Sequence, residues 1–411
     1  MGYHGRSSRY HTQMDNAIQS NTELKTIFKG MNPFTTEKHE QFRQRIRKFA
    51  EEVIKPEARK LDQEERFSPE LTRKMAEQGL FGVAIPEKYG GLGMDYMALV
   101  IAVEEIARVD GSQAATVTAV NSLGIGPIYH FGTEEQKQRF LPPITREGYT
   151  WAFGLTERGA GSDSGSTLTR AELKNGQWHI NGSKIFISNS TSDLSAGITL
   201  QAITGKQGDR NEFSTILVES DREGYTRRPI RDKMVWRAAD TGELQFRDVR
   251  VPEENLLGKR GKGHRIMLQT LDSGRLTVGA MGLGLATGAF EMAREYAQKR
   301  EQFGKPISKF QTISFKLADM ATRIETAKNT LYQATWLKVN GHPFSKEAAM
   351  AKLYTSEIAK EVADEAVQIY GGYGLIRESD IERFYRDQRI LQIGEGTSEI
   401  LKMVIARKIG L

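Results

Sequence analysis

The sequence predicts an α+β multidomain protein with an N-terminal α-helical domain, a central β-barrel or sandwich domain and a C-terminal four-helix bundle. Three observations lead to this fold class. Apolar residues recur at helical spacing before residue 150, alternate with polar residues from 151 to about 255, and return to helical spacing after Gly263. We therefore expect a flexible leader at 1–35, followed by domains at 36–150, 151–262 and 263–411.

The first domain is predicted to be all-helical. Its clearest stripe has apolar residues at spacings of four, three and four, on one helix face: Phe42, Ile46, Phe49 and Val53. Pro56 is expected to interrupt that helix. Similar stripes at 69–79, 95–109 and 134–146 indicate further helices, separated by turn residues.

The central domain is predicted from alternation. Trp178, Ile180, Ile185 and Ile187 alternate with polar residues, and the pattern continues through 214–219 and 243–251. Two dipeptides, Asn175-Gly176 and Asn181-Gly182, are typical of tight hairpin turns, so we expect a turn at each.

The last domain is predicted to be a bundle of antiparallel helices. Apolar residues alternate at spacings of four and three from Ile313 to Leu337, and a second long helix is expected to begin with a Ser345 cap. The uncharged stretch Leu276–Phe290 is short for a membrane span, and we interpret it as a buried helix.

Composition excludes several classes of site. The chain has no cysteine, which rules out disulfides, thiolate nucleophiles and Cys-ligated metals, and its seven histidines are scattered, so we expect no metal. The net charge of +6 is spread along the chain, which favours neither nucleic acid nor a membrane as a partner and suits either an anionic ligand or an ordinary solvated surface.

Glycine-rich motifs are the first candidates for chemistry. The loop at 154–163 resembles a dinucleotide fingerprint, but strands rather than a helix follow it, so its amides either cradle an anion or form a tight turn. Glu395 lies between Gly394 and Gly396 just before the final helix. Burial there would raise the pKa of the carboxylate towards that of a useful base, whereas the alternative is a helix cap by Thr397 or Ser398.

Two arginines and another glycine cluster complete the set. Arg300 and Arg275 stand beside turns, and arginine suits phosphate through its bidentate fork. Gly371 and Gly372 follow a predicted helix and suit a helix C-terminal cap. Each motif by itself is more often structural than functional.

Together and in this order, the motifs resemble those of the acyl-CoA dehydrogenase family. They are Leu-Thr-Glu-x-x-Ala-Gly-Ser-Asp at 155–163, Arg-x-Gln-Phe-Gly at 300–304, Gln-x-x-Gly-Gly at 368–372 and Glu-Gly-Thr at 395–397. The resemblance covers roughly residues 36–411. It implies non-covalent FAD, an acyl-CoA substrate, an electron-transferring flavoprotein as acceptor and a homotetramer or homodimer. We expect a bacterial cytoplasmic enzyme, with the mitochondrial matrix as the alternative.

The resemblance assigns roles by position. FAD would be bound by residues from five parts of the chain: Phe153, Leu155, Thr156, Gly161, Ser162, Phe186, Ser188, Arg300, Phe303, Gln311, Gln368, Gly371, Gly372, Thr397 and Glu399. Arg300, Phe303 and Gln311, with 368–372, would bind the FAD of a neighbouring subunit. The acyl-CoA would contact Ser162, Asp272, Arg275, Gly394 and Gly396.

The implied reaction is α,β-dehydrogenation to the 2-enoyl-CoA. Glu395 abstracts the α-proton while the β-hydride passes to flavin N5, and the thioester carbonyl is bonded by the Glu395 backbone N–H and a ribityl hydroxyl. Some relatives place the base immediately before the arginine at 275, but that position is Gly274 here.

Departures from the family pattern concern the substrate. Gly394 replaces a residue that is often aromatic, which predicts a pocket for a bulky, branched or cyclic acyl group, and Arg158 stands where many members have proline. An acyl-CoA oxidase or a flavin monooxygenase on the same fold is the alternative function, and the intact Glu-Gly-Thr motif argues against the monooxygenase.

Overall fold

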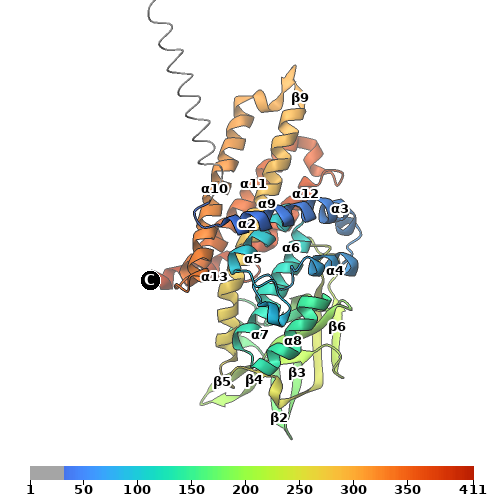
Figure 1. The fold of residues 1–411 in the computed structure, drawn as a ribbon, viewed down its shortest axis with the longest axis vertical. Helices are drawn as coiled ribbons and strands as arrows, with labels where there is room; N and C mark the ends of the chain where they lie inside the picture. Colours follow the sequence, from blue (N-terminus) through green and yellow to red (C-terminus); the bar gives the residue numbers. More distant parts are fainter. Residues whose placement is uncertain (1–31) are drawn as a thin grey trace, which may run out of the picture.

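The computed structural model describes residues 32–411, so most of the predicted leader at 1–35 lies outside the described residues. Helices, a sheet and more helices follow in the predicted order (Figure 1). In Figure 1 the sheet lies at the lower end together with α7 and α8, most other N-terminal helices lie in the middle, and α9, α10 and α11 rise to the opposite end.

The N-terminal part is all-helical, as predicted. Its α-helices are α2 (Glu37–Phe49), α3 (Lys55–Gln63), α4 (Pro69–Glu77), α5 (Tyr96–Ala107), α6 (Gly111–Thr118), α7 (Gly126–Phe131) and α8 (Glu134–Glu147). Two π-helical segments, Ala50–Ile54 and Ala119–Ile125, join neighbouring helices. The expectation that Pro56 interrupts the first helix is wrong, because the chain stays helical and Pro56 falls in the first turn of α3, where no N–H is needed.

The central part is one mixed sheet. Its strands are β1 (Thr150–Gly154), β2 (Arg170–Lys174), β3 (Gln177–Ser188), β4 (Ser195–Gln207), β5 (Arg210–Glu219), β6 (Tyr225–Pro229), β7 (Thr241–Pro252) and β8 (Leu256–Leu257). Their order is β6-β7-β3-β2-β4-β5-β8, and β1 pairs in parallel with β4. The inward side chains form a separate apolar cluster that includes Trp178, Ile180 and Phe246.

One of the two predicted hairpin turns is present. Asn175 and Gly176 both have positive φ and connect β2 to β3, with Lys174 paired to Gln177. The prediction at Asn181-Gly182 is wrong, because both residues lie inside β3 at an irregularity in its pairing with β7. Gly182 is required there by close packing, since a Cβ would lie 2.4 Å from the Thr169 hydroxyl.

The C-terminal part contains α9 (Gly263–Lys299), α10 (Gln311–Val339), α11 (Ser345–Tyr370), α12 (Ile381–Asp387) and α13 (Ser398–Lys408). A short hairpin of β9 (Glu301–Gln302) and β10 (Lys305–Pro306) links α9 to α10. Ser345 is the first residue of α11 rather than its cap, because Phe344 occupies the cap position and no side chain caps the helix there.

Helix α9 is the central element of the bundle. Among the described residues it is the one helix long and apolar enough to cross a membrane, yet 78% of its apolar window is buried inside the structure. Glycines let neighbours approach it closely: a Cβ on Gly288 would lie 2.1 Å from the Arg108 carbonyl, and one on Gly282 would lie 2.9 Å from the Thr355 carbonyl. The glycine-rich stretch predicted as a buried helix is therefore the packing surface of α9.

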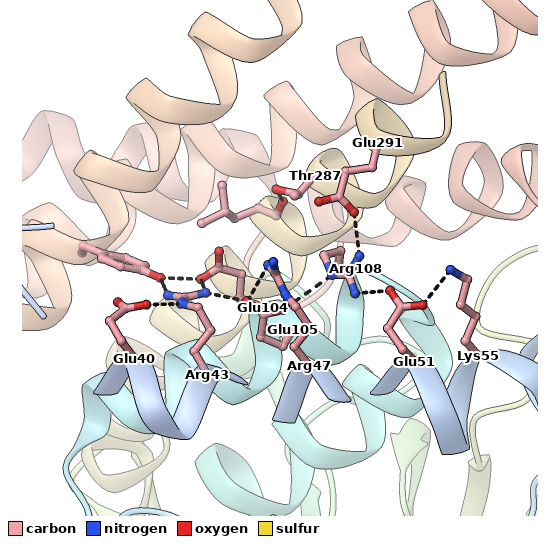
Figure 2. Close-up of polar contacts among 12 residues, drawn as sticks. Glu40, Arg43, Arg47, Glu51, Lys55, Glu104, Glu105, Arg108, Thr287 and Glu291 are labelled. Carbon is pink, nitrogen blue, oxygen red and sulfur yellow. Dashed lines mark hydrogen bonds and ion pairs between the residues drawn. The ribbon is translucent and has the colours of Figure 1, made fainter. Parts of the chain in front are cut away.

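A buried polar network connects the N-terminal helices to the bundle (Figure 2). Glu105 accepts hydrogen bonds from Arg43 at 2.6 Å and Arg47 at 2.8 Å, and Glu104 accepts one from Tyr332 of α10 at 2.5 Å. Arg108 pairs with Glu291 of α9 at 2.6 Å. Removing one partner of such a buried set leaves another charge unpaired, which typically costs about 3–5 kcal/mol.

Candidate active site

Glu395 lies in the loop between the last 3₁₀ turn, Gln388–Gln392, and α13. Its backbone is left-handed, with φ of 52°, and Gly396 follows with φ of 99°. The Thr397 hydroxyl accepts a hydrogen bond from the Ile400 N–H at 3.2 Å and caps α13. Because the Thr397 hydroxyl, and not the Glu395 side chain, accepts this hydrogen bond from the helix end, the Glu395 carboxylate does not serve as the helix cap.

Glu395 is half-buried, and one oxygen of its carboxylate is enclosed without a hydrogen-bond partner. Its Oε2 atom is among the buried side-chain oxygens that have no partner within residues 32–411. Burial raises the pKa of Glu395 to about 7, while Lys352 and Arg275 oppose the shift. An unpaired carboxylate with a pKa near neutrality is the state expected of a general base.

Gly274 of α9 forms the opposite wall. A Cβ at this position would lie 2.2 Å from Glu395 Oε2 and 3.5 Å from the Leu123 side chain. The absence of a side chain at 274 thus determines where the carboxylate can sit.

Arg275 and Asp272 lie one turn apart beside this wall and form an ion pair. Arg275 is buried, and burial lowers its pKa from the usual value. On the adjoining side the Tyr96 hydroxyl donates to the Ser273 carbonyl at 2.8 Å, and burial raises the pKa of Tyr96. Four of the five predicted substrate residues, Asp272, Arg275, Gly394 and Gly396, therefore lie on the two segments that meet at the predicted base, and Ser162 lies exposed in the loop after β1.

Phe153 near the end of β1 and Leu155 in the loop after it pack with Met267 of α9 in a small apolar cluster. Leu123 and Leu271 border the same cluster. Because Leu123 also approaches Gly274, this cluster connects the loop at 154–163 to the surroundings of Glu395.

A buried ion pair shapes that loop. Glu157 and Ala160 exchange backbone hydrogen bonds in a tight turn. The Glu157 carboxylate accepts from Lys184 at 2.8 Å and from the Thr169 hydroxyl at 2.6 Å. Burial lowers the pKa of Lys184 to about 8, and Glu157 opposes that shift. The loop contains a tight turn at 157–160, and this turn leaves Gly161 and Ser162 exposed. The two alternatives for the loop, a tight turn and a cradle for an anion, are therefore compatible.

Phe186 is presented to solvent beside the same loop. Its φ is 59°, it lies where the pairing of β3 and β7 shifts, and its side chain is 66% exposed. The neighbouring Ile185 N–H donates to the Thr156 carbonyl at 3.0 Å, and Ser188 is half-buried at the end of β3. A large aromatic side chain held out by a left-handed backbone is expected at a ligand contact.

The remaining predicted cofactor residues form a second group at the other end of α9. Arg300 lies about 39 Å from Gly274 along the helix. A cavity of about 540 Å³ is lined there by residues that include Arg300, Tyr370, Gly371 and Gly372.

Exposure distinguishes the other members of this second group. Phe303 has φ of 53° at the tip of the β9–β10 hairpin, and its side chain is 93% exposed. Gln311 and Gln368 are exposed in the same end of the bundle, whereas the exposed Glu399 lies near Glu395 in the first turn of α13. The structure thus brings the predicted cofactor residues into two separate groups within one chain.

Three family models together match nearly all of the described chain. They are the N-terminal domain of acyl-CoA dehydrogenase at residues 36–148, the middle domain at 152–249 and the C-terminal domain at 261–410. The chain belongs to the acyl-CoA dehydrogenase family.

Individual relatives agree with this assignment. The short-chain specific acyl-CoA dehydrogenase of Clostridium acetobutylicum is 41% identical over 374 residues, covering 91% of this chain and 98% of that protein. The human mitochondrial short-chain specific acyl-CoA dehydrogenase is 41% identical over 384 residues, covering 93% of this chain and 92% of that protein. The solved butyryl-CoA dehydrogenase of Megasphaera elsdenii is 40% identical, with a TM-score of 0.88 over 92% of this chain and 99% of that chain. This acyl-CoA dehydrogenase is accordingly an oxidoreductase of a flavoprotein family.

Sequence reasoning missed two lysines in this acyl-CoA dehydrogenase. Lys352 is fully buried in α11, and its ammonium donates to the Gly394 carbonyl at 3.0 Å and the Gly396 carbonyl at 2.7 Å. Lys184 is fully buried beneath the loop at 154–163. A signal for Lys352 existed, because it falls on the alanine-rich face of α11 at core spacing between Ala348 and Thr355. A lysine in such a stripe is almost never buried without a partner.

Proposed function

We propose that this acyl-CoA dehydrogenase converts a CoA thioester to its 2-enoyl-CoA with Glu395 as the base. The observation that carries the proposal is the buried, unpaired Glu395 Oε2, held against Gly274 with a pKa of about 7. Such a carboxylate is deprotonated in a useful fraction near neutral pH and is free to accept an α-proton.

The residues present fit FAD. The exposed Phe186 and the exposed Gly161 and Ser162 offer an aromatic face and free backbone beside the apolar wall of Phe153 and Leu155. When bound, FAD supplies the acceptor for the β-hydride. We assign this end of the chain, with Thr156, Ser188, Thr397 and Glu399, to the FAD nearest Glu395.

The second group is assigned to the FAD of another subunit. Arg300, Phe303, Gln311, Gln368, Gly371 and Gly372 lie too far from Glu395 along α9 to contact the same cofactor. An aromatic side chain as exposed as Phe303 is expected to be covered by a partner. This supports a homotetramer or homodimer in which two chains complete each cofactor site.

The test of the base is anaerobic bleaching of the flavin by acyl-CoA. Glu395→Gln should bind acyl-CoA and retain FAD yet fail to bleach, and bleaching at the wild-type rate would refute the base assignment. Peroxide release during turnover in air would instead indicate an oxidase.

The proposed electron acceptor is an electron-transferring flavoprotein. Support comes from a solved structure that is 42% identical to this chain, with a TM-score of 0.90, and that was determined in work on the electron transferring flavoprotein of Acidaminococcus fermentans. Reoxidation of the substrate-reduced enzyme by such a flavoprotein, followed anaerobically, tests the assignment, and the absence of electron transfer would contradict it.

The acyl group is proposed from the neighbour of the base. A Cβ on Gly394 would make only ordinary contacts, at 3.6 Å from the Ile390 carbonyl, so the glycine leaves space that a larger residue would fill. We propose that this space admits a branched or cyclic acyl group, in addition to the short chains named for the relatives. Gly394→Tyr should then lower kcat/KM for branched and cyclic acyl-CoAs more than for butyryl-CoA. Equal effects on both, or wild-type activity restricted to short linear substrates, would contradict the proposal.

A further inference from the structure

An ammonium group of α11 holds the loop that carries Glu395, between two flanking hydrogen bonds to the same helix, from Gln392 to the Ser356 carbonyl and from Ser398 to Glu357. Lys352 of α11 has no exposed surface, and its Nζ donates to the carbonyl oxygens of Gly394 and Gly396, the residues on either side of Glu395. Burial lowers the pKa of Lys352 to about 8, and Glu395 opposes that shift, so the side chain is still predominantly charged at pH 7. Hydrogen bonds from a charged donor are about twice as strong as neutral ones.

These two bonds determine the direction of the intervening peptide. The Gly394 carbonyl and the Glu395 N–H belong to one planar trans unit, so they point in opposite directions. Because the carbonyl is held towards Lys352, the N–H must point away from α11. The left-handed conformation of Glu395, with φ of 52°, is disfavoured for a residue with a side chain and needs such restraint.

The Glu395 N–H is a free donor. Among residues 32–411, no carbonyl or side chain accepts a hydrogen bond from it. A hydrogen bond accepted by a peptide carbonyl also polarises the N–H of that peptide, because bonds in a chain strengthen one another at low dielectric. The charged Lys352 therefore both aims this N–H and makes it a better donor.

We propose that Lys352 is a positioning residue for thioester recognition, fixing and polarising the Gly394–Glu395 peptide so that its N–H binds the substrate carbonyl. The inference rests on the proposed function, since it assumes that the thioester reacts beside Glu395. Lys352 itself touches neither the substrate nor the base proton. Its charge also opposes the rise in the Glu395 pKa, but its effect on thioester binding passes through the backbone of residue 395.

The alternative is that Lys352 only braces the loop against α11. A brace and a positioning residue differ in what they do to ligands. Loss of a brace weakens every ligand of the pocket, whereas loss of the aimed N–H weakens only ligands that carry a carbonyl group. The comparison of a thioester with a thioether of the same length therefore separates the two roles.

The experiment uses the FAD-loaded enzyme and two CoA ligands that cannot be dehydrogenated. (Methylthio)acetyl-CoA has the thioester carbonyl and an acidic α-proton, but sulfur replaces the β-carbon, so no β-hydride is available. S-butyl-CoA has the same chain length and no carbonyl. Dissociation constants are measured by calorimetry, and α-deprotonation of the thioester is followed by long-wavelength absorbance as a function of pH.

In Lys352→Met the dissociation constant of the thioester should rise by about tenfold or more, since direct removal of one oxyanion donor costs roughly 10²–10³-fold in rate and here the donor is only released. S-butyl-CoA should bind within about twofold of wild type, because it never used the N–H. The pH at which the bound thioester loses its α-proton should rise as well. Lys360→Met, which removes an exposed charge from the same helix, is the matched control.

Equal weakening of both ligands, or wild-type binding of both, would overturn the proposal. Should Lys352→Met fail to fold or to retain FAD, Lys352→Gln is tested instead, because glutamine keeps a neutral donor. For the inference to stand, Lys352→Gln must weaken binding of the thioester more than binding of S-butyl-CoA. Failure of the base assignment is distinguishable. Glu395→Gln keeps its backbone N–H. Flavin bleaching by that variant would refute the assignment of Glu395 as the base, but it would leave the preference for the thioester and the dependence of that preference on Lys352 intact.

Discussion

The sharpest consequence of the site geometry concerns Gly274→Ala. A methyl group there would lie 2.2 Å from Glu395 Oε2, whereas ordinary contacts begin at 3.4 Å, so the carboxylate must withdraw by about 1.2 Å. The obstacle is the end of a flexible side chain rather than backbone, so the protein can accommodate the methyl group at little cost. In a helix interior, alanine is also more favourable than glycine by about 1 kcal/mol of helix stability. We therefore expect unchanged or slightly higher thermal stability.

Catalysis should respond quite differently to this substitution. A displacement of about 1 Å of a reacting group can lower a rate by roughly 10²-fold, so the anaerobic rate of flavin reduction should fall by about that factor. FAD content and the dissociation constant for S-butyl-CoA should stay near wild type, because neither depends on the carboxylate. Gln269→Ala, an exposed change on the same helix, is the control for helix effects. Flavin reduction at the wild-type rate in Gly274→Ala would refute the placement of the base against α9.

The buried charges lead to two further predictions. Because Glu395 must be deprotonated to accept a proton and burial sets its pKa at about 7, kcat/KM should rise with pH and level off above that value; a profile flat from about pH 5.5 to 8.5 would contradict the assignment. Lys184→Met should leave the Glu157 carboxylate buried without its cation, lower stability by about 3–5 kcal/mol and weaken FAD retention. The double variant with Glu157→Gln should recover part of that loss in chemical denaturation, and additive losses would show that the pair is not coupled.

Much of the fold could be predicted because it depends on periodicity. The helix at Gln311–Val339 and the strands around Trp178 and Phe246 follow from spacing alone, and the Asn175-Gly176 turn from local chemistry. The errors arose where tertiary context prevailed. Gly182 has the pattern of a turn residue, but it lies within a strand where Thr169 packs against it. Pro56 has the pattern of a helix end, but it lies in the first turn of α3, directly after a π-helical segment that keeps the chain helical.

The site could be predicted only in part. Motif agreement predicted roles for Glu395, Gly394 and Arg275, and the structure places these three residues close together. The role of Lys352 could not be predicted, because nothing in the local sequence shows that a lysine of α11 meets two carbonyl groups more than forty residues further along the chain. Contacts of this kind depend on how helices pack, and spacing within one helix does not contain that information.

The polar network in Figure 2 limits how this enzyme can be divided or recombined. Glu104 and Glu105 lie in the N-terminal helices, but one of the groups that satisfy them, Tyr332, belongs to the bundle, and Arg108 needs Glu291 in the same way. A chimera that joins the N-terminal helices of one relative to the bundle of another must therefore inherit both halves of this set. The N-terminal and C-terminal segments, which the family models match separately, therefore have to be exchanged together for the protein to fold.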